Sequence, residues 1–231
     1  MRTKKSNQNI LEIESVDFDV FSANFIKKKL ELFSNKKAVN IALSGGSTPL
    51  PILNILKDYN LNWDTFNFFL VDERVVNVNS NQSNYKNINE IFFEFISSKS
   101  YPFLKENLSI DEMVLQYEKQ IISNVNFTKS NQPKFDIVIL GMGEDGHTAS
   151  LFPNSIALKE SKAFFVKNYV LALDSYRGTL TYPALASSKE LIVLIRGENK
   201  LKIFEKVING NGEEFPISKL LYSKINWLIA K

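Results

Sequence analysis

Residues 39–56 read VNIALSGGSTPLPILNIL, and this stretch decides the fold. Its first five residues form a short apolar run, which is typical of a strand covered on both faces. A polar turn with two glycines follows, after which Ile52, Ile55 and Leu56 recur near helical spacing. A strand, a tight turn and a helix in this order form the repeating unit of a parallel sheet.

The same alternation continues along the chain. Apolar runs predict further strands at 66–71, 135–140, 191–195 and 225–229. Apolar residues near helical spacing predict helices at 18–32, 52–56, 88–95, 111–125 and 198–208. We therefore expect an α/β fold with one domain over residues 1–231: a doubly wound, mostly parallel, Rossmann-like sheet with helices on both faces.

The bulk composition is that of an ordinary folded protein. Of the 231 residues, 44% are hydrophobic and 23% are charged, and the basic residues behind the net charge of +3 are mostly scattered. No nucleic-acid-binding motif, signal-peptide core or apolar run of the ~18 residues needed to span a membrane is found. The chain has no cysteine, which excludes disulfides and thiolate chemistry. We expect a cytoplasmic protein without nucleic-acid or membrane partners.

The first strand is followed by SGGSTP at residues 44–49, where a doubly wound sheet binds its ligands. Gly45 and Gly46 permit a tight turn with exposed N–H groups, Thr48 suits a helix cap, and Pro49 suits the first helical position. Free N–H groups at a helix amino terminus bind anions. The loop lacks the lysine and spacing of a nucleotide P-loop. We expect phosphate ligands at Ser44, Gly45, Gly46, Ser47 and Thr48; the alternative is a plain turn.

Charged residues follow the second strand. Asp72, Glu73 and Arg74 come directly after the run at 66–71. An arginine beside two acids also occurs as a surface ion pair, which is the alternative interpretation. Their position at a strand end favours a binding site, in which Asp72 and Arg74 contact the ligand.

The third strand end reads GMGEDGHTASLFP at residues 141–153. It contains the G-x-G-x-x-G spacing of a dinucleotide site, which also requires a crossover helix and an acidic residue about 20 positions further on. Pro153 interrupts the helical pattern early. Asp174, after a predicted strand at 163–173, lies too far along to serve as that acid. We therefore do not expect a nicotinamide cofactor.

This third segment contains His147, the only histidine of the chain. A lone histidine is usually structural, but this one lies in a glycine-rich loop, where an imidazole with a reference pKa of ~6.5 serves as a base near neutral pH. Asp145 is expected to hold the loop or the imidazole, and Gly143 and Gly146 leave room for a ligand. One histidine without cysteine does not suit a metal site, so no metal or other cofactor is expected.

Together, the runs at 44–49, 72–74, 83–85 and 141–153 resemble the signatures of the 6-phosphogluconolactonase family in their expected order. The resemblance continues through RGTLT at 177–181 and GENK at 197–200 to the last strand, and so covers nearly the whole chain. It implies hydrolysis of 6-phospho-D-glucono-1,5-lactone to 6-phosphogluconate in the pentose phosphate pathway, without a metal. It also implies that Arg177 and Lys200 help to hold the 6-phosphate.

Two alternatives to this activity remain. Glucosamine-6-phosphate deaminase belongs to the same wider group, but it carries a glutamate five residues after the motif histidine and a tyrosine in place of Arg74. The glutamate position is Phe152 here, which cannot relay a proton and so favours the lactonase. The second alternative is a sugar-phosphate sensor, although no DNA-binding helix pair or partner module accompanies the motifs.

The sequence supports one hypothesis for the reaction. His147 takes a proton from a water that attacks C1 and then returns it to the ring oxygen. Arg74 binds phosphate or stabilises the oxyanion, and the sequence does not decide between these roles. Neither Ser44 nor Ser47 lies in a G-x-S-x-G elbow, so a covalent intermediate is not expected. The expected partner is a small sugar-phosphate lactone, bound by a monomer or a homodimer.

Overall fold

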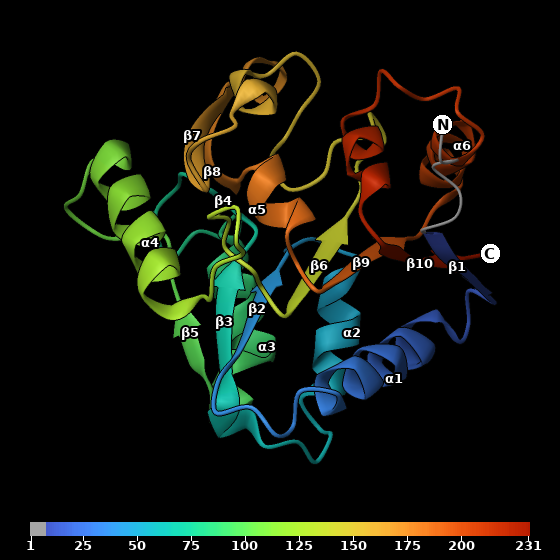
Figure 1. Ribbon diagram of the computed structural model, residues 1–231, viewed down its shortest axis with the longest axis horizontal. Coiled ribbons are helices and arrows are strands. Elements are labelled where there is room, and N and C mark those ends of the chain that lie inside the picture. Colours follow the sequence, from blue (N-terminus) through green and yellow to red (C-terminus); the bar gives the residue numbers. More distant parts are fainter. Residues whose placement is uncertain (1–7) are drawn as a thin grey trace.

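The computed structural model describes residues 8–231, which form a parallel sheet of seven strands in the order β1-β10-β9-β6-β2-β3-β5 (Figure 1). All six neighbouring pairs of strands run parallel. The strands are β1 (Gln8–Ile13), β2 (Val39–Leu43), β3 (Phe66–Leu70), β5 (Lys99–Tyr101), β6 (Ile137–Gly141), β9 (Glu190–Ile195) and β10 (Ile225–Ala230). The predicted mostly parallel sheet is confirmed.

The helices connect these strands as crossovers. They are α1 (Phe18–Glu31), α2 (Pro49–Leu56), α3 (Asn84–Ile91), α4 (Ile110–Asn124), α5 (Tyr182–Ala186) and α6 (Glu198–Ile208). The connections through α1, α2 and α3 lead toward the β5 edge, and those through α4, α5 and α6 lead back toward β1. Because such crossovers are right-handed, the two sets lie on opposite faces, as a doubly wound fold requires (Figure 1). In keeping with this, α1 packs on α2, and α2 on α3.

Burial of the strands explains their apolar sequences. All five residues of β2 and all six of β10 are buried, as expected of strands covered on both faces. Trp227 of β10 packs against Phe204 of α6, with ring centroids 5.1 Å apart. A continuous hydrophobic cluster joins the sheet to its helices. The single domain predicted for residues 1–231 stays a prediction, and residues 1–7 lie outside the described part. No helix of residues 8–231 is both long and apolar enough to cross a membrane.

A second, smaller sheet lies beyond the carboxyl end of β3. Its three antiparallel strands are β4 (Asp72–Arg74), β8 (Ser175–Leu180) and β7 (Phe165–Val170), in that order. Neither β4 nor β8 was predicted, and β1 and β5 of the large sheet were not predicted either. The strand predicted at 163–173 is shorter than expected, because β7 spans only Phe165–Val170. The chain reverses there through a 3-10 turn at Leu171–Leu173 and a left-handed Asp174, with φ of 43°. Other 3-10 helices are Trp63–Thr65, Phe93–Phe95, Ile156–Lys159 and Pro216–Tyr222.

Candidate active site

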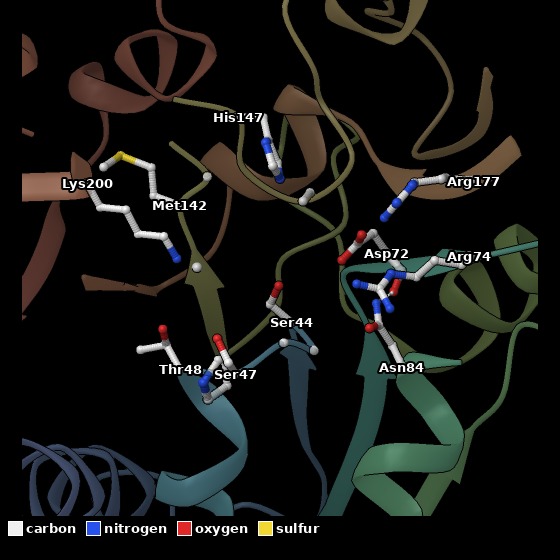
Figure 2. A pocket seen from close by; sticks show the side chains of 16 residues that line it. Ser44, Ser47, Thr48, Asp72, Arg74, Asn84, Met142, His147, Arg177 and Lys200 are labelled. Carbon is white, nitrogen blue, oxygen red and sulfur yellow. Dashed lines mark hydrogen bonds between the residues drawn. The ribbon is translucent and has the colours of Figure 1, made fainter. Parts of the chain in front are cut away.

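A cavity of about 300 Å³ opens at the carboxyl ends of β2, β3 and β6, where the three predicted strand-end segments meet (Figure 2). These strands are neighbours in the sheet, so the residues that follow them are brought to one edge. The lining residues are Ser44, Gly45, Gly46, Ser47, Thr48, Pro49, Asp72, Arg74, Asn84, Gly141, Met142, Gly143, His147, Ala149, Arg177 and Lys200.

The loop between β2 and α2 forms one side of the cavity. Gly46 has a φ of 100°, a conformation that favours glycine. Gly45 lies so close to Asn84 that a Cβ there would overlap the amide group. Thr48 caps α2 without a side-chain hydrogen bond to the helix, which leaves its hydroxyl available to a ligand. Lys200, in the first turn of α6, reaches toward this loop from across the cavity (Figure 2).

Two arginines form the opposite side. Arg74 of β4 and Arg177 of β8 are paired residues of the small sheet, and Figure 2 shows both beside Asp72. Burial lowers the pKa of Arg177, and the neighbouring Arg74 cation acts in the same direction, whereas Asp72 opposes them. A guanidinium nevertheless stays protonated. The buried Nε atoms of both arginines have no hydrogen-bond partner among residues 8–231, so this side of the cavity suits an anionic or strongly polar ligand atom.

The buried carboxylate of Glu73 links β4 to the start of α3. Glu73 is 0% exposed and accepts hydrogen bonds from the backbone N–H groups of Arg74, Asn84 and Tyr85, each 2.7 Å long, and from the Ser83 hydroxyl. Burial raises the pKa of Glu73, although these donors oppose the shift. The contacts fix the start of α3 against β4. The side chain of Asn84 consequently lies at the cavity wall, where it donates to the carbonyl oxygen of Asp72 over 2.9 Å.

His147 lies on the turn after β6, and Figure 2 shows it between the Lys200 and Arg177 sides. Its Nδ1 is 2.5 Å from Asp145 Oδ1. Burial tends to raise the pKa of Asp145, but the hydrogen bonds from His147 outweigh it, and the pKa lies below its usual value. An ionised carboxylate only accepts hydrogen bonds, so Nδ1 carries the proton and Nε2 of the neutral ring keeps a lone pair.

The turn itself holds the imidazole in place. The backbone N–H of Gly143 donates to the carbonyl oxygen of His147 over 2.8 Å. A Cβ on Gly143 would overlap the imidazole, and it would come within 2.7 Å of Asp145 Oδ1. Gly146 has a φ of 72° and packs against Phe215. Both glycines are therefore required by the geometry of this turn.

Most of the predicted site residues lie together. His147, Arg74 and all five loop residues from Ser44 to Thr48 line the cavity, as do Asp72, Gly143, Arg177 and Lys200. Asp145 lies behind the imidazole, and Gly146 lies outside the cavity lining. Arg177 and Lys200 are on different sides, although the resemblance groups both around one phosphate (Figure 2). Five residues of the lining were not predicted as site residues: Pro49, Asn84, Gly141, Met142 and Ala149. All five lie in motifs already noted in the sequence: Pro49 in the run at 44–49, Asn84 in the run at 83–85, and the other three in the run at 141–153.

The chain is similar to known proteins in both sequence and structure. Residues 19–228 match the family described as glucosamine-6-phosphate isomerases/6-phosphogluconolactonase. The chain is 35% identical to the 6-phosphogluconolactonase of Thermotoga maritima over 86% of this chain and 87% of the relative. It is 33% identical to that of Chlamydia pneumoniae over 94% and 84%, respectively. The crystal structure of a 6-phosphogluconolactonase from Thermotoga maritima superposes with a TM-score of 0.85 and 29% identity, covering 97% of this chain and 100% of that one.

Proposed function

The chain belongs to the family of glucosamine-6-phosphate isomerases and 6-phosphogluconolactonases, and we propose that it hydrolyses 6-phospho-D-glucono-1,5-lactone to 6-phosphogluconate with His147 as the base. The observation that carries this proposal is the pairing of His147 with the ionised Asp145 at a cavity that has cationic groups on two sides. A neutral phosphate-free substrate would leave one of those sides without a matching charge.

The reaction follows from the state of the imidazole. Nε2 accepts a proton from a water molecule, and the resulting hydroxide adds to C1 of the lactone. The bond between C1 and the ring oxygen then breaks, and the proton on Nε2 passes to that oxygen. The product is an open-chain acid that ionises to 6-phosphogluconate. Asp145 keeps Nδ1 protonated throughout and stabilises the imidazolium that forms between the two proton transfers.

The two cationic sides have different chemistry. The loop at 44–48 offers backbone N–H groups at a helix amino terminus, and Lys200 adds a positive charge, a combination that suits a phosphate. Arg74 and Arg177 present planar guanidinium groups beside Asp72, which suits the polar atoms around C1 and the charge that develops on its oxygen. We therefore assign the 6-phosphate to the Lys200 side, and the lactone group to the arginine side.

Two substitutions test this division. Lys200→Ala is expected to lower kcat/KM for the phosphorylated lactone by about ten- to hundredfold, the value of a charge-assisted hydrogen bond, with little change for the unphosphorylated lactone. Arg177→Ala is expected to lower kcat/KM for both lactones alike. Initial rates with the two substrates measure this difference. Unchanged selectivity in the Lys200 variant, or lost selectivity in the Arg177 variant, would reverse the assignment.

A direct assay separates the proposed activity from its alternatives. Purified protein is mixed with freshly generated lactone, and its disappearance is compared with spontaneous hydrolysis; glucosamine 6-phosphate is tested in parallel. We expect turnover of the lactone alone, because Phe152 occupies the position at which the deaminase has a glutamate. Release of ammonia from glucosamine 6-phosphate would favour the deaminase, and binding of sugar phosphates without turnover would favour a sensor.

Three features of the proposal rest on the sequence. A cytoplasmic location is proposed because the chain has no cysteine. The partner is a small sugar-phosphate lactone, bound without a cofactor. The active unit is a monomer or a homodimer, which the mass of the protein in solution would decide.

A further inference from the structure

Phe152 contacts both the base and one cation of the site, although it is absent from the cavity lining. Its ring lies 3.9 Å from the imidazole of His147, centroid to centroid, with 22° between the two planes. The guanidinium carbon of Arg177 lies 5.4 Å from the centroid of the same ring. We propose that Phe152 is a positioning residue that sets the plane of His147 and the place of Arg177 together. This rests on the proposed function, in which His147 is the base.

The backbone around Phe152 is anchored to the site on several sides. The chain turns back at Ala149, with φ of 52°, and the N–H of Leu151 donates to the carbonyl oxygen of Thr148. Ser150 donates its hydroxyl to Asp72 over 2.6 Å and its N–H to the Thr179 hydroxyl over 3.1 Å. These bonds tie the residue two positions before Phe152 to β4 and β8, the strands that carry the arginines. The position of the ring is therefore linked to theirs.

The two contacts of the ring have distinct physical effects. Asp145 holds one edge of the imidazole by a single hydrogen bond, and a hydrogen bond at one edge does not by itself fix the plane of the ring. A stacked aromatic ring removes this remaining freedom, since tilting would break the contact between the two ring faces. The ring also attracts the Arg177 cation, which burial deprives of water. One side chain thus holds a base and a cation at a fixed separation, as hydrolysis at a single carbon requires.

A single histidine makes the stack directly observable. His147 is the only source of imidazole signals in the NMR spectrum of the protein. The protons of an imidazole stacked on a phenyl ring are shielded by its ring current, so their chemical shifts report the contact independently of turnover.

The test compares three variants in the full chain. Phe152→Leu keeps an apolar side chain but removes the aromatic face. Phe152→Tyr keeps the face, and Phe152 lines a hollow of about 410 Å³ together with Asn154 and Tyr169. Phe93→Leu is the matched control, because Phe93 is 8% exposed, as Phe152 is, and lies outside the cavity lining.

We expect Phe152→Leu to move the His147 ring protons downfield, and to lower kcat by about ten- to hundredfold, as a misplaced base does. Its KM is expected to rise because Arg177 is released, and the acid limb of its pH profile is expected to shift. Phe152→Tyr should restore the shielding and most of kcat. Phe93→Leu should lower the melting temperature while the imidazole signals, kcat and pH profile stay those of the wild type.

The proposal is overturned if Phe152→Leu leaves the imidazole signals, kcat and pH profile unchanged, or if Phe93→Leu changes them equally. A leucine variant that is too unstable to measure leaves Phe152→Tyr as the deciding case, since loss of shielding or of most turnover in that variant also overturns it. Failure of the proposed function has a different signature: the wild type would not turn over the lactone, or a His147→Ala variant would keep the turnover of the wild type, whereas the dependence of the imidazole signals on Phe152 would remain.

Discussion

Replacing His147 with alanine is expected to lower kcat for lactone hydrolysis by about 10²–10⁴-fold, the usual contribution of a positioned general base. The alanine variant keeps both cationic sides of the cavity, so the substrate still binds and KM changes little. Without Nε2 the attacking water must lose its proton to bulk solvent, and the ring oxygen must leave without a nearby acid. Lactone disappearance, corrected for spontaneous hydrolysis, measures the loss.

The pH profile provides a second measure of the same role. In the wild type, protonation of Nε2 removes the lone pair, so kcat/KM falls as the pH is lowered. Asp145 does not cause that fall, because its pKa lies below its ordinary value and it stays ionised while imidazoles titrate. The residual kcat/KM of the alanine variant should not show this fall as the pH is lowered. A folded variant with turnover close to that of the wild type would exclude His147 as the base.

The strands beneath the site could be predicted because each is an apolar run that is buried on both faces. β2 was predicted with its observed bounds, Val39–Leu43, and β9 and β10 to within one residue at either end. The strand predicted at 135–140 begins two residues later and ends one residue later in the structure, where β6 spans Ile137–Gly141. Two strands of the small sheet, β4 and β8, could not be predicted in the same way. β4 has only three residues, all charged, and β8 has the polar sequence SYRGTL, so neither shows the periodicity of a strand. Pairing between distant parts of the chain forms both.

The order of the strands in the sheet, more than any individual residue, explains why the site residues meet. The three segments after β2, β3 and β6 meet because the carboxyl ends of neighbouring parallel strands lie at one edge. Asn84 could not be located by that rule, since its position depends on the buried Glu73 that holds the start of α3. Arg177 and Lys200 entered the prediction through the family resemblance alone. Their separation to opposite sides depends on β8 and α6, whose arrangement the sequence motifs do not specify.

Gly143 was predicted as a site residue, and the structure gives it a steric role beside His147. Gly143 was predicted to leave room for a ligand beside His147, and it does line the cavity. Its close approach to His147 and Asp145 has a stronger consequence, because a methyl group at this position would occupy space that the imidazole now fills. The glycine therefore permits the hydrogen bond between these two side chains. Its loss should act on the chemical step more than on binding.

Gly143→Ala is accordingly expected to lower kcat by about 10²-fold, the effect of moving a catalytic group by about 1 Å. The imidazole must swing away from the added Cβ, which separates Nδ1 from Asp145 and turns Nε2 from the cavity. Binding of 6-phosphogluconate should change little, because the Lys200 side does not include this turn. Steady-state kinetics measure the loss, calorimetric titration with 6-phosphogluconate measures the binding, and the NMR signals of the lone histidine report its displacement. Wild-type turnover with unshifted signals would mean that the turn accommodates the methyl group, and that the close contact at Gly143 does not position the base.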